Sequence, residues 1–113
     1  MSYQRTTIIE TLVAGGRCSL ARGGTPSTPE PFADSVAALE AAIGLAVRAG
    51  ELPPETDARS LAVLCAATVA GLELARWELG PGTDVLLPYD IFARGLLSAA
   101  ARRRLQPEVA ARA

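Results

Sequence analysis

Few residue types in this sequence could take part in catalysis or metal binding. The chain contains no histidine and only two cysteines, Cys18 and Cys65. Without histidine, serine–histidine and cysteine–histidine nucleophile pairs are excluded within this chain, as are the common zinc sites that use histidine. Neither cysteine belongs to a metal-binding or disulfide motif. The sequence therefore predicts no catalytic residue, no metal site and no cofactor.

The densest group of acidic side chains lies in one short segment, "RAGELPPETDARS" (48–60). Pro53 and Pro54 must interrupt a helix here, since proline costs roughly 3 kcal/mol inside a helix and an ordinary residue at most about 0.7. Gly50 suits the left-handed position after a helix end, and Asp57 suits the N-cap of the next helix. Capping and solvation account for these carboxylates, so we expect that the protein is not an enzyme.

Four segments have the composition or periodicity of helices, which predicts an all-α fold, a small helical bundle around one core. A first helix and a turn are expected within 1–22. The helix should run from about Tyr3 to Ala14, where a glycine pair at 15–16 ends it, and the turn should follow at 17–22. The stretch 23–31 is rich in glycine and proline and predicts a linker. The segment 32–113 is expected to form a helical domain. Its helices are predicted at Pro31–Ala49, at Ala58–Leu79, and from a start between Asp84 and Pro88 to about Leu105.

The helix predicted at 58–79 has apolar residues on two nearly opposite sides. The first stripe consists of Leu61, Leu64, Cys65, Thr68, Val69, Leu72 and Leu79. The second stripe consists of Val63, Ala67, Ala70, Leu74 and Trp77. A helix that buries two faces needs neighbours on both sides, and one of them is expected to be another subunit.

The last predicted helix carries Ile91, Gly95 and Ser98 beside its main apolar face, where small side chains would let another helix approach closely. Gly95 costs roughly 1 kcal/mol against alanine within a helix, which close packing would offset; alternatively, it is a neutral glycine on an exposed face. We therefore predict a homodimer. Its interface is expected to include Val63, Ala70, Leu74, Ile91, Gly95 and Ser98.

The segment "AIGLAVRAGELPPETDARSLAVLCAATVAGLELARWELGPGTDVLLPYDIFARGLL" (42–97) resembles the C-terminal regulatory domain of TetR-family transcriptional repressors. The shared features are a helix ending in "AGELP", an Ala/Leu-rich helix carrying "GL", a short turn and a last helix ending "F-x-x-GL". The stretch "GGRCSLA" (15–21) is similar to a "GC-x-L" turn of some members. The resemblance implies that the two helices after the "GELP" break pack against their copies as a dimeric four-helix bundle.

The resemblance also implies an apolar effector pocket between the helices predicted at 32–49 and 58–79. Its lining would be Leu39, Ile43, Cys65, Thr68, Leu72 and Trp77; alternatively, all six are core residues. The helix-turn-helix domain of the family is missing from this chain, so we expect no nucleic-acid binding by this chain alone.

The net charge and the hydropathy of the sequence indicate where the protein is located and which partners it can bind. The net charge of −1 provides no field that would attract nucleic acid or an anionic membrane. The longest uncharged run, Ser60 to Leu72, is too short to span a bilayer, and no secretory signal is evident. We expect a cytoplasmic, homodimeric, TetR-like regulatory domain that binds a small apolar effector and lacks its DNA reader. The alternative is a helical dimerisation or interaction module without a ligand pocket.

Overall fold

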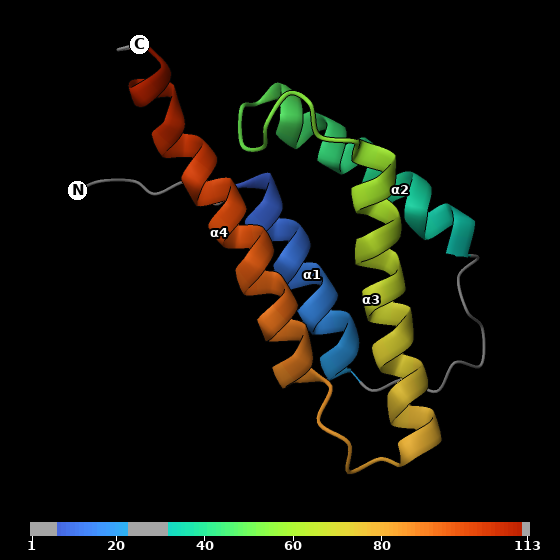
Figure 1. Ribbon diagram of the computed structural model, residues 1–113. Coiled ribbons are helices and arrows are strands. Elements are labelled where there is room, and N and C mark those ends of the chain that lie inside the picture. The colour runs from blue at the N-terminus through green and yellow to red at the C-terminus, as the bar shows by residue number, and fades with distance from the viewer. Residues whose placement is uncertain (1–6, 23–31, 112–113) are drawn as a thin grey trace.

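The computed structural model describes residues 7–22 and 32–111, and the surroundings of their side chains as far as residue 98. Four helices form the chain in these ranges, and no strand occurs in them (Figure 1). They are α1 (Ile8–Ala21), α2 (Phe32–Arg48), α3 (Ala58–Leu79) and α4 (Leu86–Ala111). The predicted all-α helical fold is confirmed, whereas the two-chain bundle stays a prediction. The predicted linker at 23–31 lies outside the described residues.

The junction between α2 and α3 has the caps that its sequence predicts. Gly50 adopts a φ of 79°, and the amide of Glu51 donates to the carbonyl of Ala46 at 2.9 Å. Asp57 then caps α3, because its Oδ1 accepts from the amide of Ser60 at 2.9 Å. This hydrogen bond lowers the pKa of the Asp57 carboxyl below its ordinary value.

The predicted end of the first helix is wrong. Instead of stopping at the glycine pair and turning at 17–22, α1 begins at Ile8 and continues through both glycines to Ala21, so "GGRCSLA" is helical. Gly16 is used for packing: a Cβ there would overlap Oη of Tyr89, which reaches across from α4. The last helix was also predicted too short, because α4 continues to Ala111.

Both ends of α1 are capped by side chains from distant parts of the chain. The carboxylate of Glu51 accepts from the amides of Ile8 and Ile9, each at 3.0 Å. At the other end, Nη1 of Arg76 donates to the carbonyl of Leu20 at 2.8 Å. An anion at the N-terminus and a cation at the C-terminus both suit the helix dipole and the unpaired end groups. These two charges fix the position of α1 against the α2–α3 junction and α3.

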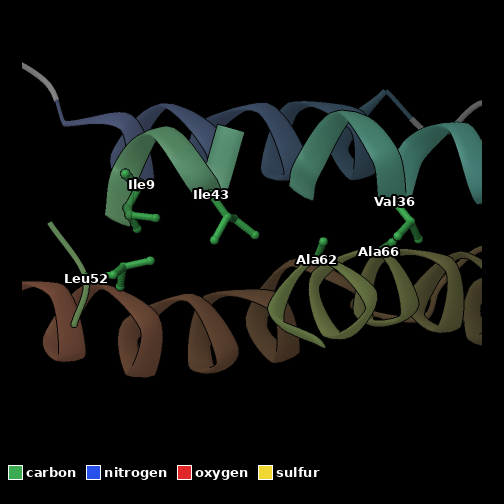
Figure 2. Packing of buried hydrophobic residues seen from close by; sticks show 7 residues of the cluster. Ile9, Val36, Ile43, Leu52, Ala62 and Ala66 are labelled. Atoms are coloured by element: carbon green, nitrogen blue, oxygen red, sulfur yellow. The ribbon is translucent and has the colours of Figure 1, made fainter. Parts of the chain in front are cut away.

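The core consists of two clusters along α1. The first contains the side chains that face one another in Figure 2, contributed by α1, α2, α3 and the α2–α3 junction. They are Ile9, Val36, Ile43, Ala46, Leu52, Ala62 and Ala66. The second cluster joins the other end of α1 to α4 and contains Leu20, Val85, Tyr89 and Ala93. α1 packs against all three other helices, whereas α3 and α4 meet over only a small part of their length.

Candidate functional site

Helix α3 does not turn either predicted apolar stripe fully into the core. Its most buried residues are Ala62 and Ala66, which lie between the two stripes and pack against α2. Small side chains at this contact allow the axes of α2 and α3 to approach closely. Neither predicted stripe included Ala62 or Ala66, although their spacing of four residues was an available signal.

The first stripe is divided between the two core clusters and solvent. Leu61 packs against the first cluster, and Val69 and Leu72 pack against the second. Leu64 and Leu79 remain exposed, with 52% and 75% of their surface accessible. Only part of this stripe is therefore core.

The six predicted ligand-binding residues are not brought together in one place. Ile43 is buried in the first cluster, where Leu39 packs against it, whereas Leu72 belongs with the second cluster. Trp77 is 65% exposed and lies on the opposite side of α3 from Leu72.

The two remaining members of this set, Cys65 and Thr68, are half-buried. The hydroxyl of Thr68 donates to the carbonyl of Leu64 at 2.7 Å, so its hydrogen is already used within α3. Burial raises the pKa of the Cys65 thiol, which therefore carries less thiolate than an exposed cysteine at neutral pH. Neither group has the environment of a nucleophile.

The second stripe is exposed throughout, and we name it the α3 outer face. It consists of Val63, Ala67, Ala70, Leu74 and Trp77, all of which the single chain leaves in solvent. These residues fall within an arc of about 80° at 100° per residue. Leu74 is 58% exposed. Between Val63 and Trp77, no charged side chain lies within this arc; Arg59, one turn before Val63, lies at its edge.

Helix α4 presents a comparable surface, which we name the α4 outer face. It consists of Leu87, Ile91, Gly95 and Ser98, which are all exposed. Ile91 is 61% exposed. A Cβ at Gly95 would meet no described atom within 4 Å, and the same is true of Gly71 beside the α3 outer face. The cost of these helical glycines, about 1 kcal/mol each, therefore has no compensating contact within the described part of the chain.

The two described ion pairs use residues outside both outer faces. Arg17 pairs with Asp90 at 3.1 Å, and Arg59 pairs with Glu40 at 3.4 Å. Hydrogen bonding to Asp90 raises the pKa of Arg17 above its ordinary value. Among the described residues, no group of three or more acidic or cysteine side chains is placed to hold a metal ion. The main surface feature of the described residues is the apolar surface of the α3 and α4 outer faces.

Comparisons with protein-family models, curated proteins and solved structures found no match for this chain. By length and composition alone, α3 could also cross a membrane, and most of it lies outside the core. Within the described residues, α3 nevertheless packs against α2 through Ala62 and Ala66. In addition, Arg76 of α3 is engaged with the end of α1.

Proposed function

We propose that this chain is a helical dimerisation domain of the kind that TetR-like regulators carry, and that it pairs through the outer faces of α3 and α4. The supporting observation is the exposure of the α3 outer face, where Leu74 and Trp77 are each more than half exposed. Covering such side chains stabilises an assembly by roughly 25 cal/mol per Å² of apolar surface. Localisation in the cytoplasm and a role in transcriptional regulation belong to the same proposal.

The lengths of the two helices are sufficient for such an interface. A 22-residue α3 is about 33 Å long, and its outer face extends over most of that length. Specific interfaces bury about 800 Å² on each partner, which two helices of this size can supply together. Gly71 and Gly95 would then occupy positions where a partner helix approaches closely.

The first test is the oligomeric state. Light scattering after size exclusion at about 20 μM should report a dimer, since even a micromolar complex is mostly assembled at that concentration. A clean monomer would refute the proposal. Gly95→Arg should weaken the dimer at least tenfold without disturbing the fold, because its Cβ meets no described atom.

Gly15→Arg is a matched control for that variant. Gly15 is also an exposed helical glycine with nothing described within 4 Å, but it lies in α1. The control should dimerise as the parent does. If both variants dimerise equally well, the interface lies elsewhere.

Binding of a small apolar effector between α2 and α3 is a second candidate function. Its support is that Cys65 and Thr68 are half-buried and that the Thr68 oxygen can still accept a hydrogen bond. An effector at 100 times its dissociation constant should stabilise the fold by roughly 2.7 kcal/mol in a thermal-shift screen. If hits bind Thr68→Leu as well as the parent, the predicted pocket is wrong and the module without a pocket is the better description.

A further inference from the structure

Helix α2 has an apolar face that points away from the core, separate from the surfaces of α3 and α4. We name it the α2 outer face and define it by six exposed residues. They are Asp34, Ala37, Ala38, Ala41, Leu45 and Arg48. At 100° per residue these positions lie within an arc of about 100°. Leu45 is 52% exposed, and the face carries no charge in the four turns between its two ends.

The spacing on this face matches the seam of a coiled coil. Asp34, Ala38, Ala41, Leu45 and Arg48 are separated alternately by four and three residues. A repeat of 3.5 residues keeps one seam facing a partner helix that crosses at about 20°. The alanines would allow interaxial distances near the lower end of the usual 8–10 Å.

The charges on the face indicate which partner fits. Asp34 and Arg48 lie seven residues on either side of Ala41, so an antiparallel copy of α2 centred on Ala41 would place each of them opposite the other. The same register places Leu45 opposite the partner's Ala37, a large side chain against a small one. In a parallel pair, like charges would face each other instead. Within the described residues, neither Asp34 nor Arg48 takes part in an ion pair.

We propose that the α2 outer face binds the α2 outer face of a second copy of this chain, antiparallel, with Ala41 at the two-fold axis. Such a contact is isologous, so each of its interactions occurs twice. The positions of Asp34 and Arg48 also suit the dipole of their own helix. That explanation accounts for the two charge types, but not for the uncharged four turns and the exposed Leu45 between them.

The contact is expected to be weak. A 17-residue helix is about 25 Å long, and one helix pair of that length buries less than the roughly 1,200 Å² of a stable complex. Together with the dimer proposed for α3 and α4, a second two-fold contact would give assemblies larger than a dimer at high concentration. The α2 contact itself does not depend on that dimer, and it is tested separately.

Disulfide trapping tests the register directly. In a background of Cys18→Ser and Cys65→Ala, the variant Ala41→Cys should form a symmetric disulfide on mild oxidation, because position 41 meets its own copy at the axis. Ala37→Cys is the matched control, being the same residue type on the same exposed face. Its two copies would be offset by eight residues, about 12 Å along the axis, beyond the roughly 7 Å limit between Cα atoms.

Ala41→Cys should therefore cross-link at least tenfold faster than Ala37→Cys. A mixture of Ala37→Cys chains with Leu45→Cys chains should cross-link faster than either variant alone. Equal rates for Ala41→Cys and Ala37→Cys would overturn the proposal, since random collision would explain both.

Exchanging the charges at positions 34 and 48 tests whether Asp34 of one copy lies opposite Arg48 of the other. In the Ala41→Cys background, Asp34→Arg should slow cross-linking several-fold, because two arginines then face each other. Adding Arg48→Asp to the same chain should restore the rate. Circular dichroism confirms that the variants remain helical. A double variant as slow as the single one would contradict the antiparallel register.

Two leucine variants separate this contact from the proposed dimer. Leu45→Glu should reduce assembly beyond the dimer and leave the dimer intact, whereas Leu74→Glu should break the dimer and leave cross-linking at position 41 unchanged. Loss of cross-linking at position 41 in the Leu74→Glu variant would show that the α2 contact has no independent existence and would overturn the proposal.

Discussion

Adjacent glycines in α1 should respond in opposite directions to the same substitution. Gly16 lies against Tyr89 of α4, where an added Cβ would overlap the phenol oxygen, whereas the Cβ position of Gly15 is open. Tyr89 is only 3% exposed, and its hydroxyl donates to the carbonyl of Val13 at 2.8 Å. Gly16→Ala should therefore destabilise the fold, and Gly15→Ala should stabilise it.

The magnitudes follow from three contributions. Replacing a helical glycine by alanine favours the helix by about 1 kcal/mol. At Gly16, overpacking opposes this by about 1–3 kcal/mol, and displacement of the Tyr89 hydroxyl removes a hydrogen bond worth about 1 kcal/mol. We expect a net loss of about 1–3 kcal/mol for Gly16→Ala and a gain of about 0.5–1 kcal/mol for Gly15→Ala.

Urea unfolding followed by circular dichroism measures both changes at constant m-value. Tyr89→Phe removes the oxygen that causes the overlap, so Gly16→Ala should cost less in the Tyr89→Phe background than in the parent. Stabilisation by Gly16→Ala equal to that by Gly15→Ala would refute the close approach of α1 and α4. The same conclusion would follow if the changes in unfolding free energy caused by Gly16→Ala and Tyr89→Phe simply added in the double variant.

Three further outcomes follow from the caps and thiols. Glu51→Gln should lower the free energy of unfolding by about 1–2 kcal/mol in urea titrations, because the amide has one acceptor oxygen in place of two charged ones at the start of α1. The pKa of Asp57 is lowered by folding, so its contribution to stability is present above its unfolded pKa, about 3.9, and is lost as the pH falls through the lower folded value. The stability of Asp57→Asn, which keeps a capping oxygen, should therefore fall less than that of the parent between pH 5 and pH 2.5, again by urea titration. Iodoacetamide at pH 8 should modify the exposed Cys18 of the folded protein before Cys65, because burial raises the pKa of the Cys65 thiol. Mass spectrometry of the peptides shows which cysteine is modified first. The reverse order would contradict the placement of Cys65.

The sequence predicted the central half of the fold well because its signals are local. Two prolines, a glycine with positive φ and an aspartate cap define the junction of α2 and α3 within a few residues of chain. The end of α1 could not be predicted in the same way. Glycines often end helices, and the contact that favours glycine at position 16 within α1 comes from Tyr89, a residue 73 positions later in the chain.

The candidate surfaces were less predictable than the helices. Periodicity correctly separated two apolar sides of α3, but it could not say that Ala62 and Ala66 between them would be the most buried residues. Burial depends on which side of α3 meets α2, and that choice is made by packing across the whole bundle. Trp77 was predicted both on the second stripe and in the pocket, and the structure places it on the exposed side of α3.

Because α1 is held at both ends by residues that come later in the chain, it cannot pack completely while the chain is being synthesised. Of the four helices, α1 is translated before the others, and its partners Glu51, Arg76 and Tyr89 follow later. At about 5–20 residues per second, several seconds pass between the last residue of α1 and the arrival of Tyr89. During that interval α2, α3 and their junction can already surround Ile9, but the cluster around Leu20 still lacks Tyr89 and Ala93. Leu20 therefore stays exposed in the nascent chain until α4 emerges, and any pause in translation before α4 would prolong that exposure.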